Sequence, residues 1–340
     1  MRRCKLVALL LVGVFMITGC QSPEGTEDPI VKDEEIKPQI GMSFDSYVTE
    51  RWLRDQETFV STAQELGADV NVQSANGDTN EQISQIEYFI EKKMDVIVII
   101  ASDANAMSEV IAKAKSSGIK VICYDRLCLN SNVDLYITFD NEKVGQLMGE
   151  AIFSEVGKNA NIIRINGPDE DYNVVSVGKG FENECKKNNA NVIGSCSCVA
   201  WRSEEAYDYI NSHLELAAQA DAIMCGNDDL AGAAISALSE NRMLNNIIVV
   251  GQDGDLNACQ RIVEGTQLMT VYKPVEKLAK KAAECAVKMA NGESLEIVET
   301  FSDGTYDVPF IRLDPISVTA KNMDDVVISG GFHLREEVYR

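Results

Sequence analysis

The sequence predicts an α/β fold made of parallel β-strands, and three features lead to this prediction. Short apolar runs recur along the chain, segments of helical periodicity separate most of them, and the runs end abruptly in polar residues. Buried parallel strands are apolar along nearly their whole length, and strands that alternate with helices indicate βαβ units. The runs fall at residues 39–42, 70–72, 96–100, 121–123, 135–139, 162–165, 192–199, 222–224, 247–250 and 269–271.

The expected helices form two series that follow one another along the chain. Gly67 and Gly118 mark the ends of helices in the first series, and Pro274 favours the first turn of the last helix. About 300 residues follow the N-terminal segment, enough for two domains of roughly 150 residues each. The expected helices lie near residues 50–66, 79–92, 106–116, 142–156, 174–188, 203–218, 231–240, 256–264 and 275–290.

The N-terminal segment predicts an exported lipoprotein. Three cations among the first five residues precede an apolar stretch at 6–17, which is too short to span a membrane. The Ile-Thr-Gly-Cys sequence that ends at Cys20 resembles the lipobox of bacterial lipoproteins, in which cleavage precedes the cysteine and its sulfur is acylated. We therefore expect a signal peptide at 1–19 and a lipid anchor on Cys20. The alternative is an ordinary secretory signal with an incidental cysteine.

Residues 20–37 are expected to form a disordered, lipid-anchored tether, because they are acidic and poor in apolar side chains. Without residues 1–19 the chain keeps 28 Lys and Arg against 53 Asp and Glu, a net charge of −25. Such an acidic surface repels phosphate backbones, so we expect no nucleic-acid partner. We expect buried free thiols that pack as small apolar groups at the cysteines in or beside apolar strand runs or on an expected helix, namely Cys123, Cys196, Cys198, Cys225 and Cys285.

Signatures of catalysis and of bound cofactors are missing from the sequence. It contains no G-x-G-x-x-G and no G-x-x-x-x-G-K-[ST], and Cys196 and Cys198 lack the spacing of metal ligands. The two histidines, His213 and His333, fall outside the expected strand ends and are expected at the surface. We therefore expect no cofactor, no metal ion and no enzymatic activity.

Polar residues gather at the carboxyl ends of the expected strands, where open α/β sheets bind their ligands. Carboxylates and amides bond to hydroxyl groups, arginine offers a rigid fork of donors, and an indole can cover the C–H face of a sugar. Carboxylates in such positions could also form a glycosidase pair. Amides and cations from both halves accompany them here, however, and this mixture favours a cleft that holds a sugar by its hydroxyls.

Several separate segments resemble bacterial D-xylose-binding proteins, and together they cover roughly residues 39–335. Those proteins are type I periplasmic sugar-binding proteins. The resemblance therefore implies two doubly wound parallel-sheet lobes, joined by a three-crossover hinge, that close over a ligand. The segments are IGMSFD at 40–45, ERW at 50–52, VQSANG at 72–77, YDR at 124–126, FDNEKVG at 139–145, ND at 227–228, GQDGD at 251–255, GTQLMTVYKP at 265–274, DVP at 307–309 and GFH at 331–333.

The resemblance also implies how the chain is divided. An N-terminal lobe would comprise residues 38–140 and 273–302, and a C-terminal lobe residues 141–272 and 303–340. The segments at 167–173 and 127–129 depart from the family pattern, which leaves the exact sugar open.

Nine ligand-binding residues are carried over from the resemblance, and six of them also have a structural alternative. Trp52 is as well explained by core packing as by ligand contact. The nine are Arg51, Asp125, Arg126, Asp171, Asn173, Trp201, Asn227, Asp253 and Lys273. The alternatives are a solvated helix face for Arg51, a turn or helix cap for Asp125, Asn227 and Asp253, core packing for Trp201, and an ion pair between lobes for Lys273.

The implied function is that of a monomeric, extracytoplasmic protein that is anchored to the cell membrane through Cys20. It would bind a monosaccharide, D-xylose first and glucose or another aldose next, and deliver it to an ABC permease. The alternative is a sensor that presents bound sugar to a membrane chemotaxis or signalling receptor. A transcriptional repressor would share the fold, but the export signal and the lack of an N-terminal DNA-binding helix pair argue against it.

Overall fold

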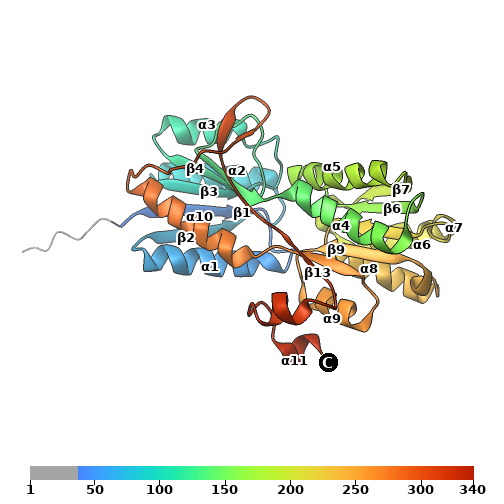
Figure 1. The fold of residues 1–340 in the computed structure, drawn as a ribbon. Helices are drawn as coiled ribbons and strands as arrows, with labels where there is room; N and C mark the ends of the chain where they lie inside the picture. The colour runs from blue at the N-terminus through green and yellow to red at the C-terminus, as the bar shows by residue number, and fades with distance from the viewer. Residues whose placement is uncertain (1–36) are drawn as a thin grey trace, which may run out of the picture. The chain divides into compact units, whose positions relative to one another are not determined.

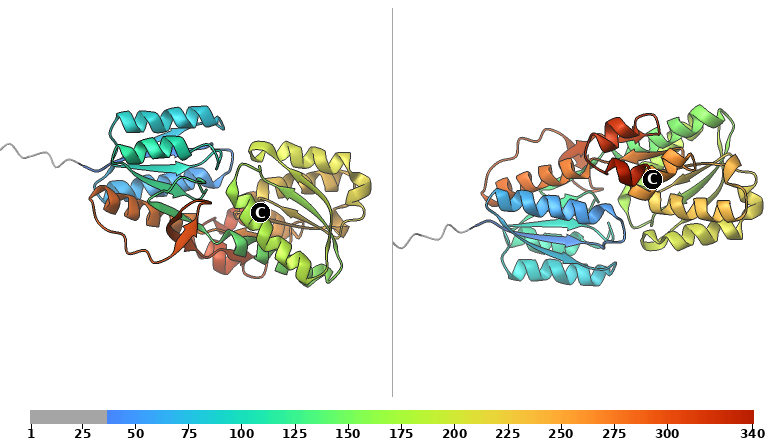
Figure 2. Two further views of the ribbon diagram at one scale, coloured as in Figure 1. Left: turned by 90° about the horizontal axis from the view of Figure 1, so that it is seen from above. Right: turned by 90° about the horizontal axis from the view of Figure 1, so that it is seen from below.

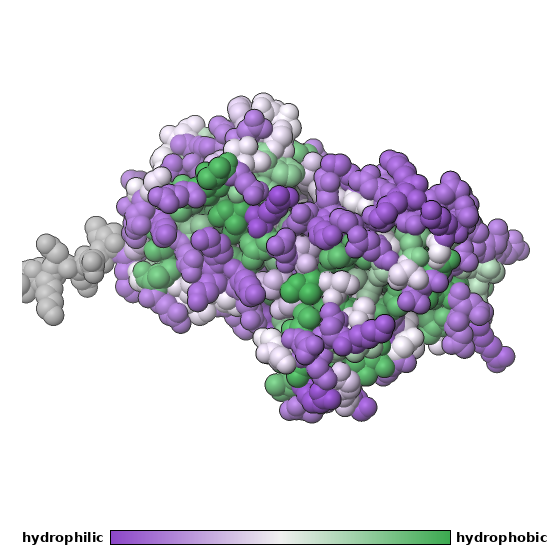
Figure 3. Space-filling view, in the orientation of Figure 1, coloured by the Kyte–Doolittle hydropathy of each residue, from purple (hydrophilic) through white to green (hydrophobic). Residues whose placement is uncertain are grey.

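The computed structural model describes residues 37–340. The expected signal peptide, Cys20 and nearly all of the expected tether lie outside this range. Among residues 37–340, no helix has both the length and the apolar character needed to cross a membrane. Hydrophilic side chains dominate the face drawn in Figure 3, as expected for a chain in which 25% of the residues are charged.

The first sheet has seven strands in the order β11-β12-β5-β4-β3-β1-β2. All neighbouring pairs are parallel except β11 and β12. β3, which reads VIVII, is buried at every residue, as a central strand covered on both faces must be. The strands are β1 Gln39–Phe44, β2 Asp69–Ser74, β3 Val96–Ile100, β4 Lys120–Tyr124, β5 Leu135–Phe139, β11 Thr300–Ser302 and β12 Asp307–Leu313.

Two pairs of helices cover the faces of this sheet (Figures 1 and 2). α1 and α10, far apart in the sequence, lie side by side and bury Phe59 and Leu278 against one face. α2 and α3 bury Phe89 and Ile111 against the other face. The helices are α1 Arg51–Glu65, α2 Thr79–Glu91, α3 Ser108–Ser116 and α10 Val275–Ala290.

The second sheet has six strands in the order β13-β10-β9-β8-β6-β7, and only β13 runs antiparallel to its neighbour. Its apolar faces are covered by α4 and α5 on one side and by α6 and α8 on the other. The elements are α4 Asn141–Val156, β6 Asn161–Asn166, α5 Tyr172–Lys187, β7 Asn191–Ser197, α6 Ser203–Ser212, α7 Leu214–Ala217, β8 Ala222–Cys225, α8 Asp228–Glu240, β9 Ile248–Gln252, α9 Leu256–Glu264, β10 Met269–Tyr272 and β13 Ile316–Val318.

Two glycines allow α4 and α5 to approach closely. A Cβ atom on Gly145 would lie 1.9 Å from the carbonyl oxygen of Val177, and one on Gly180 would lie 1.9 Å from that of Glu142. Each helix therefore needs a bare Cα where it meets the backbone of the other. The contact helps to fix the start of α5, where Asp171 is the N-cap and Asn173 lies in the first turn.

The chain passes between the two sheets three times, between β5 and α4, between β10 and α10, and between β12 and β13. The predicted fold class, two doubly wound α/β lobes joined by three crossovers, is therefore confirmed. We call the parts built on the first and second sheets the first and second lobes.

One predicted lobe boundary is wrong. The sequence prediction assigned residues 303–340 to the second lobe, but β12 pairs with β5 in the first sheet, with Phe310 opposite Tyr136. Pairing with β12 covers a side of β5 that would otherwise be an open sheet edge. The third crossover, from the first lobe to the second, therefore lies between Leu313 and Ile316. After β13, a π-helical turn at Asp324–Ile328 and the short helix α11 Arg335–Val338 complete the chain, with α11 packed against α9.

Candidate functional site

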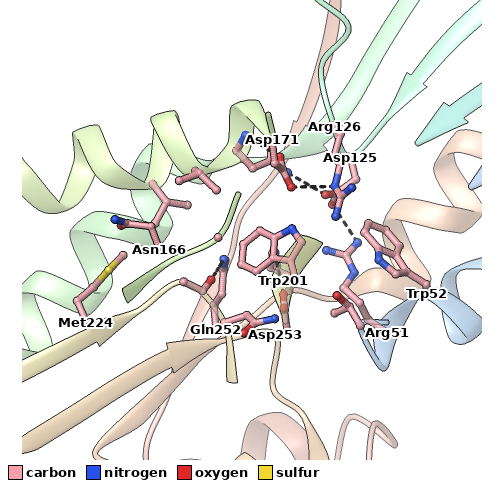
Figure 4. A pocket seen from close by; sticks show the side chains of 18 residues that line it. Arg51, Trp52, Asp125, Arg126, Asn166, Asp171, Trp201, Met224, Gln252 and Asp253 are labelled. Atoms are coloured by element: carbon pink, nitrogen blue, oxygen red, sulfur yellow. Dashed lines mark hydrogen bonds and ion pairs between the residues drawn. The ribbon is translucent and has the colours of Figure 1, made fainter. Parts of the chain in front are cut away.

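A cavity lies between the two lobes at the carboxyl ends of their strands (Figure 4). It is lined by 18 residues, which come from both lobes. The lining includes all nine residues expected from the sequence, namely Arg51, Asp125, Arg126, Asp171, Asn173, Trp201, Asn227, Asp253 and Lys273.

Arg51 is buried in the first turn of α1, so it does not lie on a solvated helix face. Its Nη2 atom lies 2.9 Å from Asp125 Oδ2 and 3.0 Å from Asp55 Oδ1, and its guanidinium carbon is 4.5 Å from the centre of the Trp52 ring. Burial alone would lower the pKa of Arg51, but the two carboxylates raise it well above its usual value. Arg51 is therefore a permanent cation that its neighbours hold in one orientation.

Asp125 and Arg126 occupy the turn that follows β4. Asp125 has a left-handed backbone with φ of 61°, and its amide donates to Ile137 O at 2.8 Å. Burial favours the neutral acid, yet Arg51, Lys273 and Arg126 together hold the pKa of Asp125 below its ordinary value. Arg126 Nη1 donates to Asp45 Oδ2 at 2.7 Å and to Ala101 O at 3.1 Å. The turn therefore presents a carboxylate and a guanidinium, both ionised, beside the cavity.

Contacts across the cavity join these loops to the second lobe. Arg126 Nε lies 2.8 Å from Asp171 Oδ2 without the angle of a hydrogen bond, so attraction between the charges carries this contact. Asn173 Nδ2 donates to Asp125 Oδ1 at 2.9 Å. Figure 4 shows Asp171 facing Arg126, with Asp125 facing Arg51 beside them. The structure is therefore a closed conformation, in which polar groups of the two lobes pair with each other.

Asp253 and Lys273 form an ion pair on the second-lobe side, with Lys273 Nζ 2.8 Å from Asp253 Oδ1. Lys273 is thus in an ion pair, but its partner follows a strand of the same sheet, so the pair is not the one between lobes that the alternative described, and both side chains line the cavity. Asp253 has φ of 102°, and the turn that contains it is held by the buried Asp228, whose Oδ2 accepts from Gly254 N at 2.9 Å. Burial raises the pKa of Asp228 to about 7.

Both tryptophans of the chain line the cavity and also pack in the core. Trp52 lies edge-on to Phe44 at 6.1 Å, with Arg51 and Arg126 over its ring. The sequence indicated an apolar strand run at 192–199, but the observed strand stops before Trp201. β7 ends at Ser197, and a turn at Val199–Trp201 intervenes.

A buried donor and a buried acceptor in the lining have no partner among residues 37–340. They are Trp201 Nε1 and Gln252 Oε1. Gln252 is oriented by its own amide nitrogen, which donates to Gly226 O. An unpaired buried polar atom costs roughly 1–3 kcal/mol, so both atoms favour a ligand that accepts from one and donates to the other.

The sequence prediction missed part of the lining. Gln252 and Asn166 are the last residues of β9 and β6, so the expectation that polar residues at strand ends line the ligand site applies to them. Nothing in the sequence separated Val174, Val177 and Met224 from ordinary core residues. The additional lining residues are Thr49, Trp52, Asn166, Gly167, Val174, Val177, Met224, Gly226 and Gln252.

The helix-cap alternative for Asn227 and its place in the cavity lining are both found in the structure. Asn227 is the N-cap of α8, since its Oδ1 accepts from Leu230 N at 2.9 Å, and it lines the cavity as well.

His333 was expected at the surface, but it is buried, and its Nε2 lies 2.8 Å from Gly254 O. The eight cysteines within residues 37–340 are free, and all except Cys196 are buried.

The charges that line the cavity balance. Three cations (Arg51, Arg126 and Lys273) face three carboxylates (Asp125, Asp171 and Asp253). Within the described part of the chain, no cluster of three or more His, Cys, Asp and Glu residues is arranged to hold a metal ion. Balanced charges with abundant donors and acceptors suit a neutral ligand rich in hydroxyls, because each hydroxyl can donate to a carboxylate and accept from a cation.

Comparisons with known proteins agree with this geometry. A family model described as periplasmic binding protein domain matches residues 40–294. The chain is 42% identical to a D-xylose-binding periplasmic protein of Haemophilus influenzae, over 88% of this chain and 92% of that protein. It is 39% identical to the D-xylose-binding periplasmic protein of Escherichia coli, over 90% and 93% of the two chains. The resemblance proposed from sequence motifs is therefore confirmed.

A similar fold is found among solved structures. An ABC transporter solute-binding protein from Clostridium phytofermentans with bound β-D-glucose superposes with a TM-score of 0.81 at 26% identity. The match covers 88% of this chain and 99% of that one.

Proposed function

This chain belongs to the periplasmic binding protein family, and we propose that it binds a monosaccharide, D-xylose, between its lobes and delivers it to an ABC sugar importer. The observation that carries the proposal is the cavity itself. Side chains from both lobes converge there, their charges balance, and a buried donor and a buried acceptor face it without partners in the described chain. The two relatives named above are D-xylose-binding proteins, which supports that choice of sugar.

The proposed role is binding and release rather than chemistry. The relatives are binding proteins, and the lining carboxylates are held by cations: Asp125 by Arg51, Asp171 by Arg126 and Asp253 by Lys273. The surrounding cations lower the pKa of Asp125, whereas burial raises the pKa of Asp171. Such paired carboxylates suit hydrogen bonding to hydroxyls.

A thermal-shift screen over pentoses and hexoses tests the choice of ligand. A ligand at 100 times its Kd adds about 2.7 kcal/mol to the free energy of unfolding. For a folded body of about 300 residues that corresponds to a rise in Tm of roughly 4 °C. We expect D-xylose to give the largest rise, and an uncharged non-sugar polyol at the same concentration serves as the control. If no pentose and no hexose raises the Tm, the sugar assignment is wrong.

We further propose that the mature protein is attached to the membrane through acylated Cys20, with residues 20–37 as a tether. The proposal rests on the lipobox-like sequence that ends at Cys20. The Cys20→Ala variant is expected to lose its acyl chains, so that fractionation finds it in the soluble rather than the membrane fraction. An unlipidated wild-type protein, established by mass spectrometry of the mature N-terminus, would show that the anchor does not exist.

A further inference from the structure

The indole of Trp201 rests on a surface that only glycine can provide. A Cβ atom built on Gly167 would lie 2.3, 2.4 and 2.6 Å from Cη2, Cζ2 and Cζ3 of Trp201. These are consecutive atoms of the benzene ring at nearly equal distances, so the ring lies with its face over the Gly167 Cα atom. A Cβ atom on Gly226 would lie 3.2 Å from Cζ3 of the same ring. The two glycines follow β6 and β8, which are neighbouring strands.

The backbone that carries Trp201 is held in an unusual conformation beside this surface. Ala200 and Trp201 both have left-handed backbones, with φ of 51° and 59°. Left-handed conformations are unfavourable for residues with a Cβ atom and persist only where the surroundings enforce them. The turn is held by Trp201 N donating to Cys198 O at 3.2 Å and by Val199 N donating to Glu205 Oε2 at 2.8 Å. The backbone of Trp201 therefore has little freedom to move away from Gly167.

With one face against Gly167, the ring also lines the cavity (Figure 4). Its Nε1 is buried and has no hydrogen-bond partner within residues 37–340. We infer that Gly167 is a positioning residue that sets how deep the cavity is, by letting Trp201 lie back from the space that the ligand occupies. This inference rests on the proposed function, since it concerns the same cavity.

The Gly167→Ala variant tests the inference, because the three nearest atoms to the added methyl group all belong to the Trp201 ring. The ring must move away from residue 167 and narrow the cavity. By calorimetry we expect the affinity for the cognate sugar to fall about tenfold, the equivalent of 1.4 kcal/mol. A pentose and a hexose that the wild type binds are compared, and the bulkier sugar is expected to lose more affinity.

A double-mutant cycle shows whether the effect passes through Trp201. In a Trp201→Ala background the added methyl group has no ring to displace, so Gly167→Ala should change the affinity less than about twofold. Gly194→Ala is the matched control, because its Cβ atom would lie 2.6 Å from Leu216 Cδ2 in the same lobe, outside the cavity lining. The control is expected to lower the Tm and to keep wild-type affinity.

A readout without sugar separates this inference from the proposed function. The chain has two tryptophans, so in a Trp52→Phe background the indole emission reports on Trp201 alone. Gly167→Ala should shift that emission, whereas Gly194→Ala should not. Unchanged emission, or equal affinity losses with and without the Trp201 ring, overturns the role of Gly167 even if the wild type binds sugar. Failure of the wild type to bind any sugar would instead refute the proposed function, and the emission would still report on the position of the ring.

Discussion

Replacing Arg126 with alanine is expected to lower the affinity for D-xylose at least tenfold. Arg126 contacts Asp45 of its own lobe and Asp171 of the other lobe, and it is 4% exposed. Its removal leaves both carboxylates without their cation in the closed state. An unpaired buried polar group costs roughly 1–3 kcal/mol, and more when it is charged, while 1.4 kcal/mol is a factor of ten in affinity. Titration calorimetry measures this loss.

Two further variants show which property of Arg126 matters. Arg126→Lys keeps the charge but has a single nitrogen in place of the fork that reaches both carboxylates, so its affinity should lie between those of the wild type and Arg126→Ala. Arg335→Ala is the control, because Arg335 pairs with Asp324 on the exposed surface and does not line the cavity. If Arg126→Ala kept wild-type affinity, Arg126 would not be part of the binding site. Its contact with Asp171 would then not contribute to binding either.

Much of the fold could be predicted because the sequence changes sharply from apolar to polar residues where the strands end. β4, β8 and β9 are short apolar runs that stop at Asp125, Asn227 and Asp253, and parallel strands place such ends at one edge of a sheet. The division into lobes was harder to predict. β12 joins the first sheet because it covers an edge of β5 that would otherwise be open. The seven residues of β12 contain no pattern that indicates which of the two sheets they pair with.

The pairing of side chains across the cavity could not be predicted. The contact between Arg126 and Asp171 depends on how far the lobes close, which is not encoded in the pattern of either segment. The turn at Ala200 and Trp201 could not be predicted either, because neither residue type favours a left-handed backbone. Val174 and Met224 were missed because apolar residues that line a cavity have the same local pattern as core residues.

The central claim is that a sugar is held between two lobes, each of which supplies part of the site. Arg51, Asp125 and Arg126 come from the first lobe, while Asp171 and Trp201 come from the second. A ligand bound by both lobes favours the closed state over more open ones, because only the closed state makes all of its contacts. Without ligand, contacts such as that between Arg126 and Asp171 favour the closed state.

Small-angle X-ray scattering of the wild type with and without D-xylose tests this claim most directly. The sugar is added at a concentration that calorimetry shows to be saturating, and a sugar that does not bind serves as the control. We expect the radius of gyration to decrease with D-xylose and to stay the same with the control sugar. A scattering curve that D-xylose leaves unchanged at saturation would contradict a site formed by the closing of two lobes.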